Sequence, residues 1–192
     1  MFKKIALAGV VTLAFSSSGA MADDPLVSTT AGSGKITFKG TVVDAPCGID
    51  PDSADQTINF GQISKALLDN NGTSEQKDVD IRLVNCTIPA AGKKVSVSFN
   101  GGFVTGQKTE LNALGPSDAT KNTTGVAVVM ASQAVDTQGE LVSFDGSKGK
   151  DVTLQPGDNT LHYTAWVKKA AKQANVNPGD FSAVTNFVLT YQ

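Results

Sequence analysis

The stretch GKITFKGTVVDAPC (residues 34–47) carries the pattern that decides the fold. Ile36 and Phe38 alternate with Lys35 and Lys39, so a β-strand here would place apolar side chains on one face and charged side chains on the other. Such a pattern is typical of a half-buried strand in an antiparallel sheet. It lies near the front of the chain, where most domains begin with a loose tail. The stretch therefore predicts a strand that fills a core, either its own or that of another chain.

Residues 1–22 have the pattern of a secretory signal peptide. Lys3 and Lys4 form a basic region, residues 5–15 form an apolar region, and residues 20–22 (Ala-Met-Ala) form a cleavage site. The apolar region is too short to span a bilayer. We therefore expect the mature chain to be exported.

The mature chain is acidic. Without Lys3 and Lys4, 14 Lys and Arg residues remain against 18 Asp and Glu residues, a net charge of −4. A scattered set of cations on an acidic chain gives little attraction to phosphate backbones. We expect no nucleic-acid partner.

The two cysteines, Cys47 and Cys86, predict one intramolecular disulfide in an oxidising compartment. Closing a loop of about 40 residues would destabilise the unfolded chain by about 4 kcal/mol in the loop-entropy account. The alternative is a metal site, which would need further ligands in a chain whose single histidine is His162.

Short strand patterns between turn sequences fill the rest of the chain, and they predict one antiparallel, immunoglobulin-like sandwich domain. A helical turn is expected within 64–72, with Ser64 as its cap and Gly72 as its stop. Lys168 and Lys169 are interpreted as a solvated strand end. The predicted strands after the first are 56–60, 77–86, 93–99, 125–131, 159–169 and 180–192.

No catalytic arrangement is readable. His162 lies in the middle of a predicted strand without a nucleophile motif near it. The stretch GSGKIT (32–37) lacks both the first glycine and the hydroxyl residue of a phosphate-binding loop. We expect no catalytic residue, no metal, no cofactor and no small-molecule substrate.

The C-terminus has strand character up to its penultimate residue, which is unusual for a secreted domain. Gly179, the fourteenth residue from the end, precedes the strand. Alternating residues share one strand face: Phe181, Ala183, Thr185, Phe187, Leu189 and Tyr191.

The motifs GKITFKGTVVDAPCGI, QTINFGQISKALL, LVNC, LHYTAWVKKA and DFSAVTNFVLTYQ resemble those of pilin subunits of chaperone–usher fimbriae, most closely the major rod subunits. The resemblance implies an all-β fold, an incomplete immunoglobulin-like (pilin) sandwich that lacks its seventh strand. A donor strand from a neighbouring subunit would complete it. The implied organisation is a signal peptide (1–22), an N-terminal donor-strand extension (23–39) and a pilin domain (40–192).

The same resemblance implies the site residues and the partners. The partners would be identical and related pilin subunits joined head to tail, a periplasmic fimbrial chaperone and an outer-membrane usher. The chain would be exported through the periplasm to the fimbrium at the cell surface. The donor strand would present Gly32, Gly34, Ile36 and Phe38. The groove and chaperone-contact strand would present Gly179, Phe181, Ala183, Phe187, Leu189 and Tyr191.

The leading hypothesis is the major structural subunit of a fimbria, which polymerises by donor-strand exchange into a rod used for cell adhesion. A minor subunit, either an adaptor or a terminator, shares the same motifs. A glycan-binding adhesin is a further alternative: Trp166 and Tyr163 could stack on a sugar, although aromatic residues within a strand are more often core. A secreted enzyme would need a convergent polar site.

Overall fold

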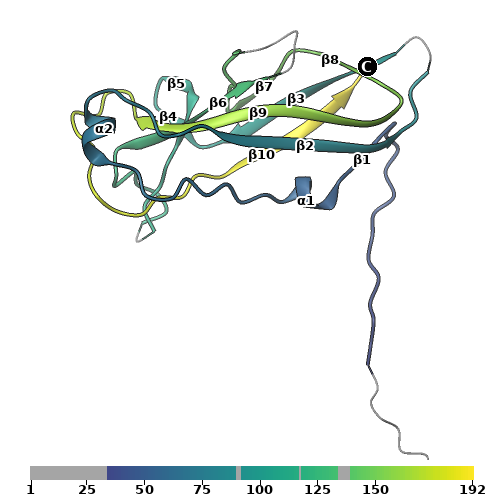
Figure 1. Cartoon of the computed structure of the whole chain (residues 1–192), viewed down its shortest axis with the longest axis horizontal. Helices are drawn as coiled ribbons and strands as arrows, with labels where there is room; N and C mark the ends of the chain where they lie inside the picture. Colours follow the sequence, from purple (N-terminus) through teal and green to yellow (C-terminus); the bar gives the residue numbers. More distant parts are fainter. Residues whose placement is uncertain (1–33, 90–91, 117, 134–138) are drawn as a thin grey trace, which may run out of the picture. The chain divides into compact units, whose positions relative to one another are not determined.

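The computed structural model describes residues 34–89, 92–116, 118–133 and 139–192 (Figure 1). The chain divides into two compact units, Met1–Thr41 and Val42–Gln192. In the described part of the first unit, residues 34–41, no strand forms, and Ile36 and Phe38 are 79% and 89% exposed. An alternating stretch adopts a ladder only when a strand edge is available to it, so the strand predicted here is unpaired in the single chain.

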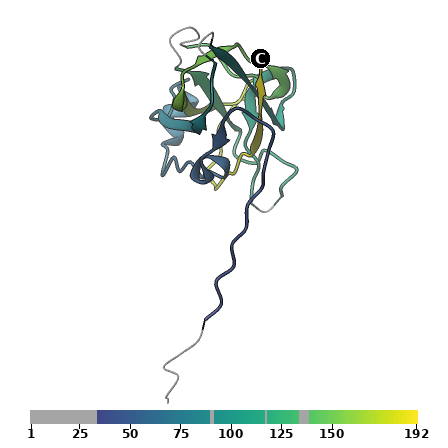
Figure 2. The ribbon, with the colours of Figure 1, turned by 90° about the vertical axis from the view of Figure 1, so that its right-hand side faces the viewer.

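The second unit is a sandwich of two antiparallel sheets (Figure 2). Two short helices, α1 (Pro51–Ala54) and α2 (Lys65–Asp69), precede most of the strands. The first sheet has the order β1 (Gly48–Ile49), β2 (Lys77–Cys86), β9 (Gly157–Lys169), β6 (Val126–Ser132), β5 (Gln107–Asn112) and β4 (Phe103–Val104). The second has the order β10 (Thr185–Tyr191), β3 (Lys93–Gly101) and β7 (Asp145–Lys148), and β8 (Val152–Leu154) also pairs with β3.

The core lies between the sheets. Alternation in β2 buries Ile81 and Leu83, and alternation in β3 buries Val95, Val97 and Phe99. Every residue of β6 is buried, as its continuous apolar run predicts. The predicted strands at 77–86, 93–99, 125–131 and 159–169 are confirmed.

The disulfide between Cys47 and Cys86 is present. It joins the residue before β1 to the last residue of β2, and both cysteines are buried. Beside it the Thr87 N–H donates to the Pro46 carbonyl at 2.8 Å. The predicted covalent link is confirmed.

The helical turn predicted within 64–72 forms as α2, and its C-terminal cap lies at Asn70, before the predicted stop at Gly72. Ser64 occupies the N-cap position of α2 as predicted, although its side chain makes no capping hydrogen bond. The chain turns out of the helix at Asn71, which takes a left-handed conformation (φ 60°). Gly72 contributes by close approach, because a Cβ there would lie 2.8 Å from the Leu67 carbonyl oxygen.

Two carboxylates fix the connection between β9 and β10. Glu110, 5% exposed, accepts a hydrogen bond from Lys168 Nζ at 2.8 Å and another from the Ala171 N–H at 2.7 Å. Asp69 pairs with Lys65 and accepts the Val176 N–H at 2.8 Å. The interpretation of Lys168 as a solvated strand end is therefore wrong, since its ammonium neutralises a buried carboxylate.

The described residues include no helix that is long and apolar enough to cross a membrane.

Candidate functional site

The candidate site is the free edge of β10, the last strand of the chain (Figure 1). β10 pairs with β3 from Thr185–Gly101 to Tyr191–Val95, and among the described residues no strand pairs with its other edge. Gln192 and Lys94 exchange backbone hydrogen bonds at 2.9 and 3.2 Å. Because antiparallel pairs alternate, the N–H groups of the even-numbered β10 residues point at β3 and those of the odd-numbered ones point at the open edge.

The burial of the core-facing side chains also indicates that β10 lacks a neighbouring strand on its open edge. The core-facing side chains of β3 are at most 5% exposed, whereas those of β10 pack on the core and remain only half-buried. A sheet position that lacks one lateral neighbour leaves its side chains open on that side. The half-buried residues are Phe181, Ala183, Thr185, Phe187, Leu189 and Tyr191.

Aromatic contacts tie this strand to both sheets. The ring of Phe187 lies 6.4 Å from that of Phe99 in β3, and Phe99 meets Tyr163 of β9 edge-to-face at 5.2 Å. Burial raises the pKa of Tyr163 to about 12, and it also raises the pKa of Tyr191. Both phenols therefore stay neutral at physiological pH, as a core requires.

A second stretch with unpaired backbone is the segment 56–63 between α1 and α2. Its backbone forms no hydrogen bond to another described backbone group, so the strand predicted at 56–60 is absent from both sheets. Its side chains still alternate, with Ile58 and Phe60 half-buried and Thr57 and Asn59 exposed. Two extended segments that pack on the core, β10 and residues 56–63, therefore have backbone groups without a partner strand.

Gly179 lies at the entrance to β10. Its φ is 149°, a conformation that side chains with a Cβ rarely adopt. A Cβ there would lie 3.5 Å from Thr124 Cγ2, an ordinary contact, so the backbone angle rather than crowding favours glycine.

The structure describes three of the four residues predicted for the donor strand. Gly32 lies outside the described residues. Gly34 is described, and a Cβ on it would meet nothing within 4 Å. Ile36 and Phe38 are exposed in the single chain. Sequence reasoning missed Ile58 and Phe60 as site residues, although the alternation in QTINF is the pattern that could have identified them.

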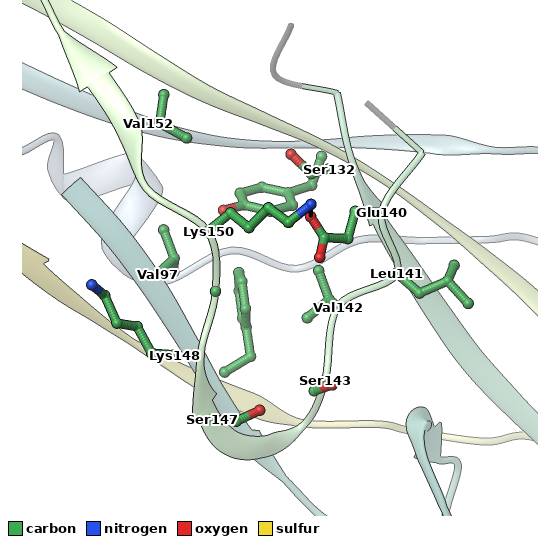
Figure 3. Close-up of a pocket in the computed structure, with 13 residues that line it drawn as sticks. Val97, Ser132, Glu140, Leu141, Val142, Ser143, Ser147, Lys148, Lys150 and Val152 are labelled. Carbon is green, nitrogen blue, oxygen red and sulfur yellow. Dashed lines mark ion pairs between the residues drawn. The ribbon is translucent and has the colours of Figure 1, made fainter. Parts of the chain in front are cut away.

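A cavity of about 170 Å³ lies on the β7 side of β3, away from the open edge (Figure 3). Val97, Phe99 and Tyr163 line it from the core, and Glu140 and Lys150 form an ion pair at 3.1 Å among its lining residues. Phe99 therefore contacts the cavity as well as Phe187 of β10.

A sandwich with a disulfide near its first strand and an open edge at its last strand is typical of a subunit that accepts a strand from a partner. The sequence profile of the family described as "Fimbrial protein" matches residues 36–192, and the chain belongs to this family.

Individual relatives agree with the family. The chain is 47% identical to the Pap fimbrial major pilin protein of Escherichia coli, over 98% of this chain and 99% of that one. It is 37% identical to the major MR/P fimbria protein of Proteus mirabilis, over 84% and 85%. Among solved structures, the P pilus rod subunit PapA matches with a TM-score of 0.67 and 45% identity, over 77% of this chain and 100% of that chain. A chain of a chaperone–usher pilus matches with a TM-score of 0.75 and 47% identity, over 84% and 97%.

Proposed function

We propose that this chain is the major structural subunit of a chaperone–usher fimbria and that it polymerises by donor-strand exchange. Residues 23–39 of one subunit add to the open edge of β10 in the next. The observation that carries the proposal is the one-sided pairing of β10 together with its half-buried core face. An extended segment added to such an edge supplies both backbone partners and side chains for the core.

The donor has the matching chemistry. Ile36 and Phe38 are 79% and 89% exposed in the single chain, and burying each contributes about 1.5–3 kcal/mol in addition to the new backbone ladder. Gly32 and Gly34 share their strand face, where small residues allow close approach of the two backbones. The acceptor face is formed by Phe181, Ala183, Phe187, Leu189 and Tyr191, with Gly179 at its entrance.

The same contact repeated head to tail gives a filament, because a heterologous interface that does not close on itself propagates. Before assembly the open edge needs a temporary partner, which a periplasmic chaperone provides before an outer-membrane usher passes the subunit to the cell surface. The identity to relatives named major pilins favours the major subunit over an adaptor or a terminator. The role is structural, and we assign no catalytic residue, metal or cofactor to it.

The test is assembly of the mature chain, with and without residues 23–39, in a periplasm that also expresses a fimbrial chaperone. We expect the full chain to give fibres by electron microscopy and a ladder in unboiled SDS gels. The truncated chain should give only chaperone-bound subunit. A stable free monomer from both chains would contradict the proposal.

Side-chain variants sharpen the test. Ile36→Asp with Phe38→Asp should abolish the ladder, because both carboxylates would enter an apolar groove. Lys35→Asp with Lys39→Asp changes the opposite face and should leave assembly intact. Equal loss of assembly in the two double variants would show that charge, and not the buried face, determines the result.

A further inference from the structure

A concavity of about 570 Å³ lies on the six-stranded sheet and is separate from the open edge of β10. Trp166 of β9 and Val129 of β6, which are cross-strand partners, contribute apolar surface to it, together with Leu141. Tyr163 points into the core and is 7% exposed, whereas Trp166 faces the other way and is only half-buried. The reading of both aromatic residues as core is therefore right for Tyr163 and wrong for Trp166.

The polar part of the concavity is rich in amides and hydroxyls. Asn71, Thr73, Thr109 and Gln173 line it, and the structure shows no hydrogen bond from their side chains to any other described residue. Amide and hydroxyl groups beside an exposed aromatic ring are the groups that pair with sugar hydroxyls while the ring covers an apolar sugar face. The volume also lies in the range of ligand-binding clefts.

The charge in the concavity is opposite to that of the chain. Three lysines and one glutamate line it, whereas the mature chain is net acidic. Glu110 neutralises Lys168. Lys169 Nζ donates to the Asp69 carbonyl oxygen at 3.1 Å and Lys172 Nζ to the Thr105 carbonyl oxygen at 3.5 Å, so these two ammonium groups face carbonyl dipoles without a carboxylate as hydrogen-bond partner. The carboxylate of Asp69 lies outside the lining; it is paired with Lys65 and also interacts electrostatically with Lys169, so Lys172 is the cation with the least neutralised charge.

We propose that this concavity binds an acidic oligosaccharide. One sugar ring stacks on the indole of Trp166. Its hydroxyls pair with the amides of Asn71 and Gln173 and with the neighbouring threonines. The sugar carboxylate lies against Lys169 and Lys172, the two cations that no carboxylate among the lining residues neutralises. The fibre would then present one such site per subunit, and weak single sites repeated along a polymer bind multivalent surfaces tightly.

The test uses assembled fibres and, in parallel, the chaperone-bound subunit, with 3′-sialyllactose as the anionic probe and lactose as its neutral counterpart. Trp166 is the only tryptophan of the chain, so in fibres its fluorescence reports directly on the concavity. We expect a saturable fluorescence change with sialyllactose, an affinity at least about tenfold lower for lactose, and weaker binding of sialyllactose at high salt.

Variants separate stacking from charge. Lys172→Gln should lower the affinity about tenfold, whereas Lys94→Gln, the same charge change at an exposed residue of β3 outside the concavity, should leave it unchanged. Trp166→Ala should abolish binding measured by calorimetry, and Trp166→Phe, which keeps a ring, should retain part of it. The phenylalanine variant and Lys172→Gln remain informative if the alanine variant does not fold.

Three results would overturn the proposal. One is equal binding of lactose and sialyllactose, and another is equal affinity in Lys172→Gln and Lys94→Gln. The third is binding by the chaperone-bound subunit that fibres lack, which would mean that a neighbouring copy covers the concavity in the polymer.

Discussion

At the scale of single residues, Glu110 is the group on which the approach to β10 depends. Its two carboxylate oxygens accept hydrogen bonds from Lys168 and from the Ala171 backbone, and the Glu110 side chain itself is buried. Glu110→Gln leaves the Lys168 ammonium without its counter-charge, and we expect a loss of about 1–3 kcal/mol in the free energy of unfolding. Denaturant unfolding measures this loss in a subunit whose open edge is filled by a peptide of residues 23–41.

The matched control for Glu110 is Glu75→Gln. Glu75 pairs with Lys77 at 2.6 Å, but its side chain is 81% exposed and its ion pair is screened by water, so this change should leave the free energy of unfolding almost unaltered. Equal losses in the two variants would mean that burial does not set the strength of the Glu110 interactions.

Asp69 makes the same connection dependent on pH. Its hydrogen bonds from Lys65 and then from the Val176 N–H lower the pKa of the carboxyl below its ordinary 3.8. A carboxyl whose pKa is lower in the folded state stabilises the fold above the unfolded value, and this stabilisation is lost as the pH falls through the folded value. We expect Asp69→Asn to lower the thermal midpoint at pH 7 and to flatten its fall below about pH 4. Parallel pH curves for the two proteins would contradict this.

At the scale of the element, β10 has one satisfied edge and one open edge. The odd-numbered residues Thr185, Phe187, Leu189 and Tyr191 direct their N–H groups to the open edge, whereas those of Asn186, Val188 and Thr190 bond to β3. We expect the odd-numbered amides to exchange hydrogen quickly in a subunit that lacks residues 23–39 and has been released from the chaperone. Addition of a peptide of residues 23–41 should protect them. The even-numbered amides of the same strand serve as the control, and uniform protection before peptide addition would show that the edge is already covered.

Strand patterns also explain what the sequence could and could not reveal. The strands β2, β3, β6 and β9 were predictable because their apolar residues alternate or run continuously. The strand β5 (QKTELN, Gln107–Asn112) is mostly polar and gives no such pattern. QTINF (56–60) has an alternating pattern but does not belong to either sheet. Alternation indicates which face of a segment is apolar, but it does not indicate whether a free strand edge is available for pairing. The orientation of Trp166 could have been predicted from the same alternation: Leu161, Tyr163 and Val167 share the core face of β9, and Trp166 lies on the opposite face with His162.

At the scale of the whole molecule, the disulfide closes a loop that contains β1, both helices and β2. Cys47 and Cys86 are 39 residues apart, and they join the start of the domain to the end of β2. Cys47→Ala with Cys86→Ala should cost about 4 kcal/mol in the free energy of unfolding, on the loop-entropy account. Denaturant unfolding of the peptide-complemented subunit tests it. The domain lacks one core strand until a partner supplies it, so the disulfide matters most at that stage. We therefore also expect less folded, chaperone-bound subunit from the double variant than from the unchanged chain. An unchanged unfolding midpoint would show that the loop is already constrained in the unfolded chain.

Assembly depends on the register of the donor strand. Ile36 and Phe38 share a face because they are two residues apart, and a shift of one residue moves a side chain to the opposite face. One alanine inserted after Thr37 would place one of the two apolar anchors outside the core. We therefore expect a strong loss of the SDS-resistant ladder.

Two alanines inserted at the same point restore the shared face with wider spacing, so the ladder should partly return. Two alanines inserted between residues 28 and 29, ahead of the alternating stretch, should have a much smaller effect, because the register of Ile36 and Phe38 is unchanged. A steady loss with insertion length, without the return at two residues, would mean that the length of the extension and not its alternation governs assembly.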